Sequence, residues 1–133
     1  MTGRRNDFPI TENFRGVELE CHGENCCGGA VIVRDALAKA LQALRYVLGK
    51  PFSPTCGYRC PKHNAEVGGS ATSDHLTGHA VDIPVPEGWE AEAFARQCLK
   101  AGFLRAGYYN KRGFVHATIA RREGLPRIWI GEK

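Results

Sequence analysis

The chain has 133 residues, a length that suits a single domain with one hydrophobic core. Its 43% hydrophobic and 24% charged residues are ordinary for a globular protein, and the net charge of +4 comes from scattered Lys and Arg residues. A nucleic-acid-binding protein usually carries a basic stripe, and a membrane span needs about 20 consecutive apolar residues. The sequence has neither, so we expect no nucleic-acid partner and no membrane span.

The chain is expected to form an N-terminal arm of residues 1–16 and a core of residues 17–133. Two amphipathic helices are predicted within the core. From Val31 onward, apolar residues recur every three or four positions, and Gly49 is placed to end this helix. A second helix is expected over residues 90–101, with acidic residues in its first turn and a lysine in its last. Both helices are expected to contribute to packing rather than to chemistry.

The remaining elements are mostly extended. Residues 51–59 are expected to be extended, and Pro61 suits the first turn of a short helix over residues 62–67. Further strands are predicted from Ala80 and over residues 103–109, 113–119 and 127–130, with a hairpin turn over residues 108–113. This order indicates an α+β domain, with an antiparallel sheet and helices packed on one face.

The stretch of residues 73–83 carries the first chemical signal. His75 and Asp82 lie seven residues apart across a glycine, and the chain then enters an apolar run. Because strand side chains alternate, Asp82 points away from the side on which Val81 and Ile83 are buried. An unpaired carboxylate inside a fold is costly, so Asp82 needs a metal, an arginine or a cluster of N–H groups as partner.

A third candidate ligand is His116, which lies in the alternating run 113–119. Three nitrogen and oxygen ligands, with a fourth position left to water, are the arrangement of a catalytic zinc site, whereas structural zinc sites usually close all four positions. From spacing alone, a hydrogen-bonded core cluster of His75, Asp82 and His116 without a metal remains an alternative.

The chain also contains a family signature, S-x-H-x-x-G-x-A-x-D, formed by Ser73, His75, Gly78, Ala80 and Asp82. It resembles that of the zinc peptidases that cut D-alanyl peptides of bacterial cell walls. These include D-Ala-D-Ala carboxypeptidases, murein endopeptidases and phage endolysins, and the hedgehog signalling domain is a relative. Residues 56–61 with Asn64 and residues 67–69 resemble the family's S-G-Y-R segment, and residues 113–116 resemble its third-ligand strand.

The resemblance implies a hedgehog-like or D-Ala-D-Ala-peptidase-like fold and one zinc ion per chain, held by His75, Asp82 and His116. The implied function is zinc-dependent hydrolysis of D-Ala-containing peptide bonds, with peptidoglycan peptides as partners.

Three further residues receive roles from the resemblance. Arg59 is expected to steady the substrate's peptide group or the developing oxyanion, because a guanidinium is planar and permanently charged. Ser73 and Tyr109 are expected to hydrogen-bond the substrate, and a structural role for each is the alternative.

The general base is missing from its expected place. Relatives carry a Glu or Asp either shortly before the third ligand or two residues after it. Here residues 110–114 contain no carboxylate, the later position holds Thr118, and Cys56 replaces the serine of S-G-Y-R. Three interpretations remain open: a base from elsewhere, such as Asp74 or Glu123; a slow enzyme that relies on zinc alone; or a non-catalytic zinc-binding module that binds the wall or belongs to a phage structure.

The six cysteines are many for a reduced cytosolic protein and few for a disulfide scaffold. Cys21, Cys26 and Cys27 form either a second, Cys-rich metal site that needs His22 or a distant fourth ligand, or buried thiols, or a local disulfide.

No apolar stretch follows residues 1–7, so no signal peptide is expected. A protein that acts on the cell wall or in the periplasm then needs another way out. Release of a phage- or prophage-encoded lysin through a holin is one such route, and a leader removed before residue 1 is another.

Overall fold

The structure, a computed structural model, describes residues 6–109 and 111–131. Residues 1–5 of the expected arm and Asn110 of the expected hairpin turn lie outside the described residues. None of the helices in the described ranges is long and apolar enough to cross a membrane. The elements in chain order are η1 (Gly16–Glu18), α1 (Asp35–Leu48), α2 (Pro61–Glu66), η2 (Asp74–Thr77), β1 (Ala80–Pro84), α3 (Ala91–Ala101), β2 (Arg105–Tyr109), β3 (Phe114–Thr118) and β4 (Ile128–Ile130).

Both predicted amphipathic helices are present, and α1 begins at Asp35 rather than Val31. The later start has a local cause, because Arg34 is extended and is tied to the loop that ends η2. Its backbone N–H donates to the carbonyl of Gly78 at 3.1 Å, and its Nε donates to the carbonyl of Thr77 at 2.8 Å. At the other end, Gly49 adopts a φ of 69° and stops the helix as predicted.

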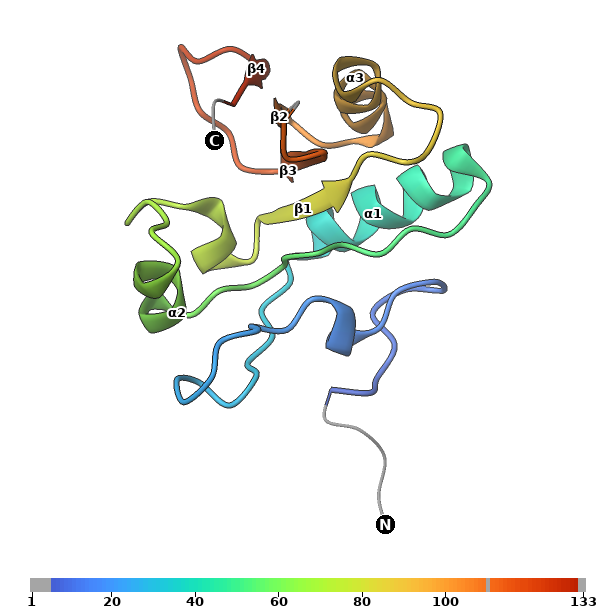
Figure 1. The fold of residues 1–133 in the computed structure, drawn as a ribbon. Helices are drawn as coiled ribbons and strands as arrows, with labels where there is room; N and C mark the ends of the chain where they lie inside the picture. Colours follow the sequence, from blue (N-terminus) through green and yellow to red (C-terminus); the bar gives the residue numbers. More distant parts are fainter. Residues whose placement is uncertain (1–5, 110, 132–133) are drawn as a thin grey trace.

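The strands form one sheet in the order β1-β3-β2-β4, which confirms the α+β prediction (Figure 1). The pairs β1–β3 and β3–β2 are antiparallel, but β4 pairs with β2 in parallel, so the sheet is mixed rather than purely antiparallel. Residues 51–59 form no strand and make a single bridge, between Cys56 and Asp82. Prolines at positions 51 and 54 supply no N–H groups for a longer ladder.

The two faces of the sheet differ in character. One face packs against α1 and α3 in the main core, to which the strands contribute Val81, Ile83, Ala106, Tyr108, Val115 and Ala117. The alternate residues lie on the other face, where strand pairing aligns one row of four: Asp82, His116, Gly107 and Trp129. The fold therefore sets two predicted metal ligands side by side on the face opposite the core.

Candidate metal centre

The three predicted ligands meet at one carboxylate oxygen. Nε2 of His75 lies 3.1 Å and Nδ1 of His116 lies 3.2 Å from Oδ1 of Asp82. The two imidazole rings are in edge contact, with centroids 5.0 Å apart. His75 is 1% exposed, whereas the side chains of Asp82 and His116 are 18% and 17% exposed. The cluster is therefore buried on the His75 side and open on the other.

His75 is positioned by the short helix η2 and by the segment before it. The Ser73 hydroxyl caps η2 by accepting the N–H of His75 at 3.2 Å. Gly78 ends η2 with a φ of 76°, and a Cβ there would lie 2.5 Å from the carbonyl oxygen of Ile32, so a side chain is excluded. Nδ1 of His75 donates to the carbonyl of Gly57 at 2.7 Å, which directs Nε2 toward Asp82 and fixes the ring as the outer partners of metal-binding histidines do.

Charge is shared within the cluster. Burial lowers the pKa of His75, but hydrogen bonds to Asp82 and Cys56 outweigh it and raise this pKa to about 10. Burial raises the pKa of Asp82, but hydrogen bonds from His116 and His75 lower it well below its ordinary range. An ionised carboxylate facing two imidazole nitrogens is a donor set that suits zinc, and a bound cation would take the place of the imidazole protons.

Cys56 brings a further potential donor atom that sequence reasoning treated only as a departure from the family pattern. Its sulfur lies 3.7 Å from Nδ1 of His75, and its donor atom lies within 4.8 Å of those of His75 and Asp82. The Cys56 thiol sits beside the nitrogen that bonds to Gly57, so it contacts His75 at the Nδ1 edge of the ring.

A cleft of about 270 Å³ opens over this cluster. Arg59 lines it, and one of its terminal amino groups donates to the Ser73 hydroxyl at 3.1 Å. Its Nε is buried and has no hydrogen-bond partner among the described residues. Ser73 does not line the cleft, and its hydroxyl already contacts Arg59 and the N–H of His75. Arg59 therefore lines the cleft with a guanidinium whose Nε is buried and unpaired, whereas Ser73 holds its neighbours in place.

Tyr109 also lines the cleft and stacks on Phe114, with ring centroids 4.6 Å apart and an interplanar angle of 15°. Burial and the nearby charge of Asp82 raise the pKa of Tyr109, so its phenol stays protonated at neutral pH and is able to donate a hydrogen bond. Arg112 lies over the ring of Phe114 at 5.3 Å and brings a second guanidinium to the cleft. Sequence reasoning assigned no role to Arg112.

Trp129 is a second residue that the sequence did not single out. Its ring centroid lies 5.9 Å from that of His116, and it reaches this position by covering Gly107. A Cβ on Gly107 would lie 2.6 Å from Nε1 of the indole, so the absence of a side chain there is required. The available signals were a glycine within a predicted strand and a tryptophan in the last strand, but connecting them needs the parallel pairing of β2 with β4.

The two carboxylates suggested as a distant base do not line the cleft. Asp74 is 8% exposed, accepts the Thr118 hydroxyl at 2.9 Å and pairs with Arg122. Glu123 lines a different hollow, beside Leu104 and several arginines. Among the described residues that line the cleft, Asp82 is the sole carboxylate.

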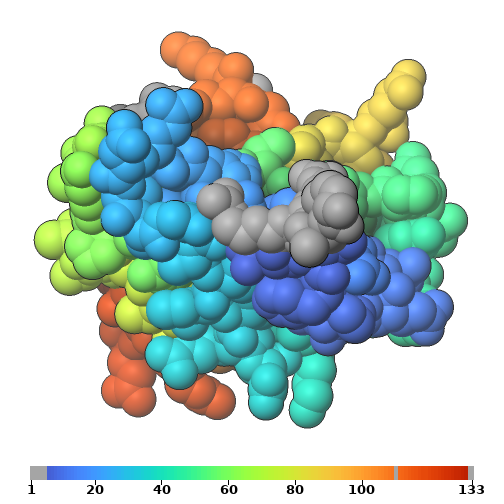
Figure 2. Space-filling model, turned by 90° about the horizontal axis from the view of Figure 1, so that it is seen from below, coloured from blue at the N-terminus to red at the C-terminus, as the bar shows by residue number. Residues whose placement is uncertain are grey.

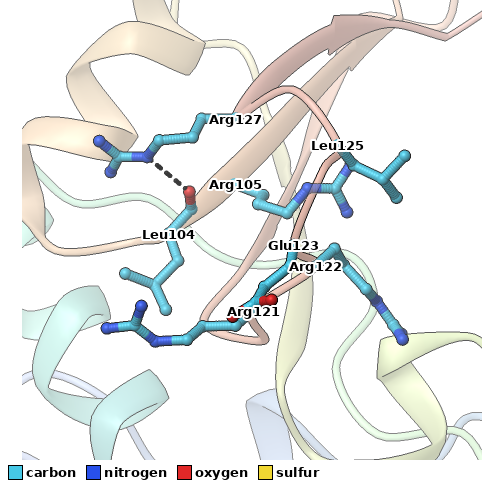
Figure 3. A pocket seen from close by; sticks show the side chains of 7 residues that line it. All are labelled: Leu104, Arg105, Arg121, Arg122, Glu123, Leu125 and Arg127. Atoms are coloured by element: carbon cyan, nitrogen blue, oxygen red, sulfur yellow. Dashed lines mark hydrogen bonds between the residues drawn. The ribbon is translucent and has the colours of Figure 1, made fainter.

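That other hollow gathers arginines without a common target, at the opposite end of the β2–β3 pair from Tyr109. Figure 3 shows the guanidinium groups pointing in different directions. Arg127 donates to the carbonyl of Leu104 at 3.0 Å, and Arg105 donates to the carbonyl of Pro126 at 3.1 Å. Arg105 also lies 4.3 Å from the ring centre of Trp129. These groups serve to hold the segment after β3 against the sheet.

A family model and a curated relative are similar to this chain. A family model described as peptidase M15 matches residues 12–118. A zinc D-Ala-D-Ala carboxypeptidase from Streptomyces albus G is 37% identical over 78 residues, which cover 53% of this chain and 31% of the relative. The matched part therefore spans about a third of that relative's length.

Proposed function

The chain belongs to the peptidase M15 family, and on this premise we propose that it is a zinc-dependent peptidase that hydrolyses D-Ala-containing peptide bonds of bacterial peptidoglycan. One observation carries the proposal. Nε2 of His75, Nδ1 of His116 and Oδ1 of Asp82 converge in a cleft that Arg59 also lines. Zinc held by these three residues would supply Lewis acidity, which polarises a peptide carbonyl and acidifies water.

In this proposal the chain's own residues bind and orient the peptide. Arg59 lines the cleft, where its guanidinium would stabilise the charge that develops on the carbonyl oxygen in the transition state. Tyr109 donates a hydrogen bond from its phenol to the substrate from the side of the cleft. The Gly57 carbonyl keeps His75 in a single orientation throughout.

Hydrolysis is tested with the whole chain, loaded with zinc and incubated with purified sacculi and with synthetic stem peptides that end in D-Ala-D-Ala. Released peptides and D-alanine are followed by liquid chromatography and mass spectrometry. We expect release that stops with a chelator and with His116→Ala. His79→Ala is the matched control, because His79 belongs to the same loop, bonds to the Thr77 hydroxyl and does not line the cleft. If the loaded protein releases nothing over long incubation, hydrolysis is rejected.

A second candidate function follows from the carboxylates. Asp82 is the only acidic residue among the described lining of the cleft, and general acid–base help is typically worth about 10²–10⁴ in rate. A zinc-binding module that binds the wall without cutting it fits this observation. It predicts that the loaded protein sediments with sacculi, and that the sacculi remain intact.

The proposed substrate places the protein at the cell wall or in the periplasm, with peptidoglycan peptides as its partners. The relative supports a wall substrate through its name. Release of a phage- or prophage-encoded protein through a holin stays a prediction.

A further inference from the structure

Four thiols from two distant segments meet beside α2. The sulfur atoms of Cys21, Cys26, Cys27 and Cys60 all lie within 4.8 Å of one another. Individual separations are 4.0 Å between Cys21 and Cys26 and 3.8 Å between Cys26 and Cys27. Figures 1 and 2 show the light-blue segment that carries the first three cysteines lying next to the green segment that contains α2. The distant fourth member that the sequence could not identify is therefore Cys60.

The sulfur separations match a metal site better than a disulfide. A Zn–S bond of about 2.3 Å gives sulfur–sulfur edges of about 3.8 Å in a regular tetrahedron. A disulfide instead requires an S–S distance of about 2.05 Å. The observed distances of 3.8 and 4.0 Å fit the tetrahedron.

Backbone N–H groups already point at these sulfur atoms. Cys60 donates its N–H to the sulfur of Cys21 at 3.5 Å, Ala30 donates to Cys27 at 3.4 Å, and His63 donates to Cys60 at 3.4 Å. Such bonds stabilise thiolate charge and orient metal ligands.

The loop that carries the thiols is shaped for close approach. Asn25 takes a positive φ of 54°, as do Gly28 and Gly29 at 71° and 79°. A Cβ on Gly23 would lie 2.7 Å from the sulfur of Cys26, so this position admits no side chain without a shift. The loop turns tightly around the sulfur atoms.

The lobe around this loop has little hydrophobic core of its own. Its separate buried cluster consists of Cys21, Tyr58 and Cys60, with Cys26, Cys27 and Ala30 partly buried against it. A small unit with so few buried apolar side chains commonly needs a metal or a covalent link to stay folded.

From these contacts we propose that Cys21, Cys26, Cys27 and Cys60 hold a second, structural zinc ion as a closed tetrathiolate site. Binding exchanges the remaining thiol protons for the cation and involves no electron transfer. All four positions are filled by protein, so the ion has no place for water and serves stability rather than hydrolysis. The proposal uses none of the cleft residues, and it stands or falls separately from the proposed function.

The test uses the full chain with His116→Ala, purified under reducing conditions without added metal, so that the cleft lacks one of its three ligands and sulfur neighbours report the thiol site. Elemental analysis is expected to find one zinc per chain, and X-ray absorption at the zinc edge four sulfur neighbours at about 2.3 Å. The wild-type chain would carry two zinc ions if its cleft site is also filled. Adding Cys60→Ser should remove the sulfur-bound zinc. Cys98→Ala is the matched control, because Cys98 is a buried thiol in the main core, outside the cluster.

A measurement that does not depend on a folded cysteine variant completes the test. Cobalt(II) loaded into the His116→Ala chain should give the intense visible and near-ultraviolet bands of a tetrahedral thiolate complex. Three results would each overturn the proposal. They are zinc that has only nitrogen and oxygen neighbours, a thiol cluster that binds iron in place of zinc, and a protein mass two hydrogens below that of the free-thiol chain, which would indicate a disulfide.

Discussion

Thr118 stands two residues after His116, where the family resemblance leads one to expect a general base. Its side chain is fully buried, donates to Oδ2 of Asp74 at 2.9 Å and accepts the N–H of Ala120 at 3.0 Å. Asp74 in turn pairs with Arg122. The substitution Thr118→Asp would therefore set a second carboxylate directly against the buried carboxylate of Asp74.

The size of the effect follows from that geometry. Two unit charges about 4 Å apart repel by about 4 kcal/mol at an effective dielectric constant near 20. The lost hydrogen bond adds about 1 kcal/mol. Arg122, whose side chain is 39% exposed, offsets part of this cost. We expect Thr118→Asp to lower the free energy of unfolding by about 3 kcal/mol, a large share of the ~5–15 kcal/mol of a typical domain.

Urea unfolding at pH 7 measures this in wild type, Thr118→Asp, Asp74→Asn and the double variant. The double variant should regain about 2 kcal/mol relative to the sum of the single losses, because the amide introduced at position 74 removes the repulsion and can donate to the new carboxylate. Additive losses, or a single variant as stable as wild type, would refute the reasoning. The double variant is also the fair test of whether a carboxylate at position 118 increases hydrolysis.

Two further predictions concern the site itself. In the presence of a chelator, the raised pKa of His75 adds stability that is complete below its ordinary value of 6.5 and is lost as the pH rises to about 10, while the lowered pKa of Asp82 adds stability that is lost below its ordinary 3.8. The thermal midpoint of unfolding should therefore decrease as the pH rises from 6.5 to 10, and His75→Gln should make this decrease smaller. A midpoint that is constant across that range would contradict the raised pKa of His75. Gly107→Ala should displace the Trp129 indole from His116, shift its fluorescence to longer wavelength and cost about 1–3 kcal/mol, and an unchanged emission spectrum would show that the indole does not cover Gly107.

Local patterns were enough to predict much of the fold. Apolar residues with a period of 3.6 located both long helices. Gly49 marked the end of α1, because a glycine stops a helix through its own left-handed backbone conformation and needs no distant contact. Strict alternation placed Asp82 and His116 on the side of their strands away from the core. The α+β class follows from these elements, since the sheet must bury one face against the helices.

Long-range pairing was beyond the sequence patterns. The parallel pairing of β4 with β2 depends on the path of the segment after β3, and that pairing alone brings Trp129 over Gly107 and against His116. The late start of α1 likewise depends on a contact between Arg34 and the loop at Gly78, which are far apart in sequence. No local propensity encodes such contacts.

The short segment of residues 56–60 connects the cleft with the thiol cluster. Cys56 bridges to Asp82, the Gly57 carbonyl orients His75, and Arg59 lines the cleft. The next residue, Cys60, belongs to the thiol cluster. The middle of this segment is held by contacts outside the sheet, because the N–H groups of Tyr58 and Arg59 donate to the carbonyls of Leu19 and His75 at 3.0 and 3.2 Å. A tetrathiolate zinc at Cys60 would anchor one end, and the bridge to β1 anchors the other, so the guanidinium and the carbonyl between them are held where the cleft needs them.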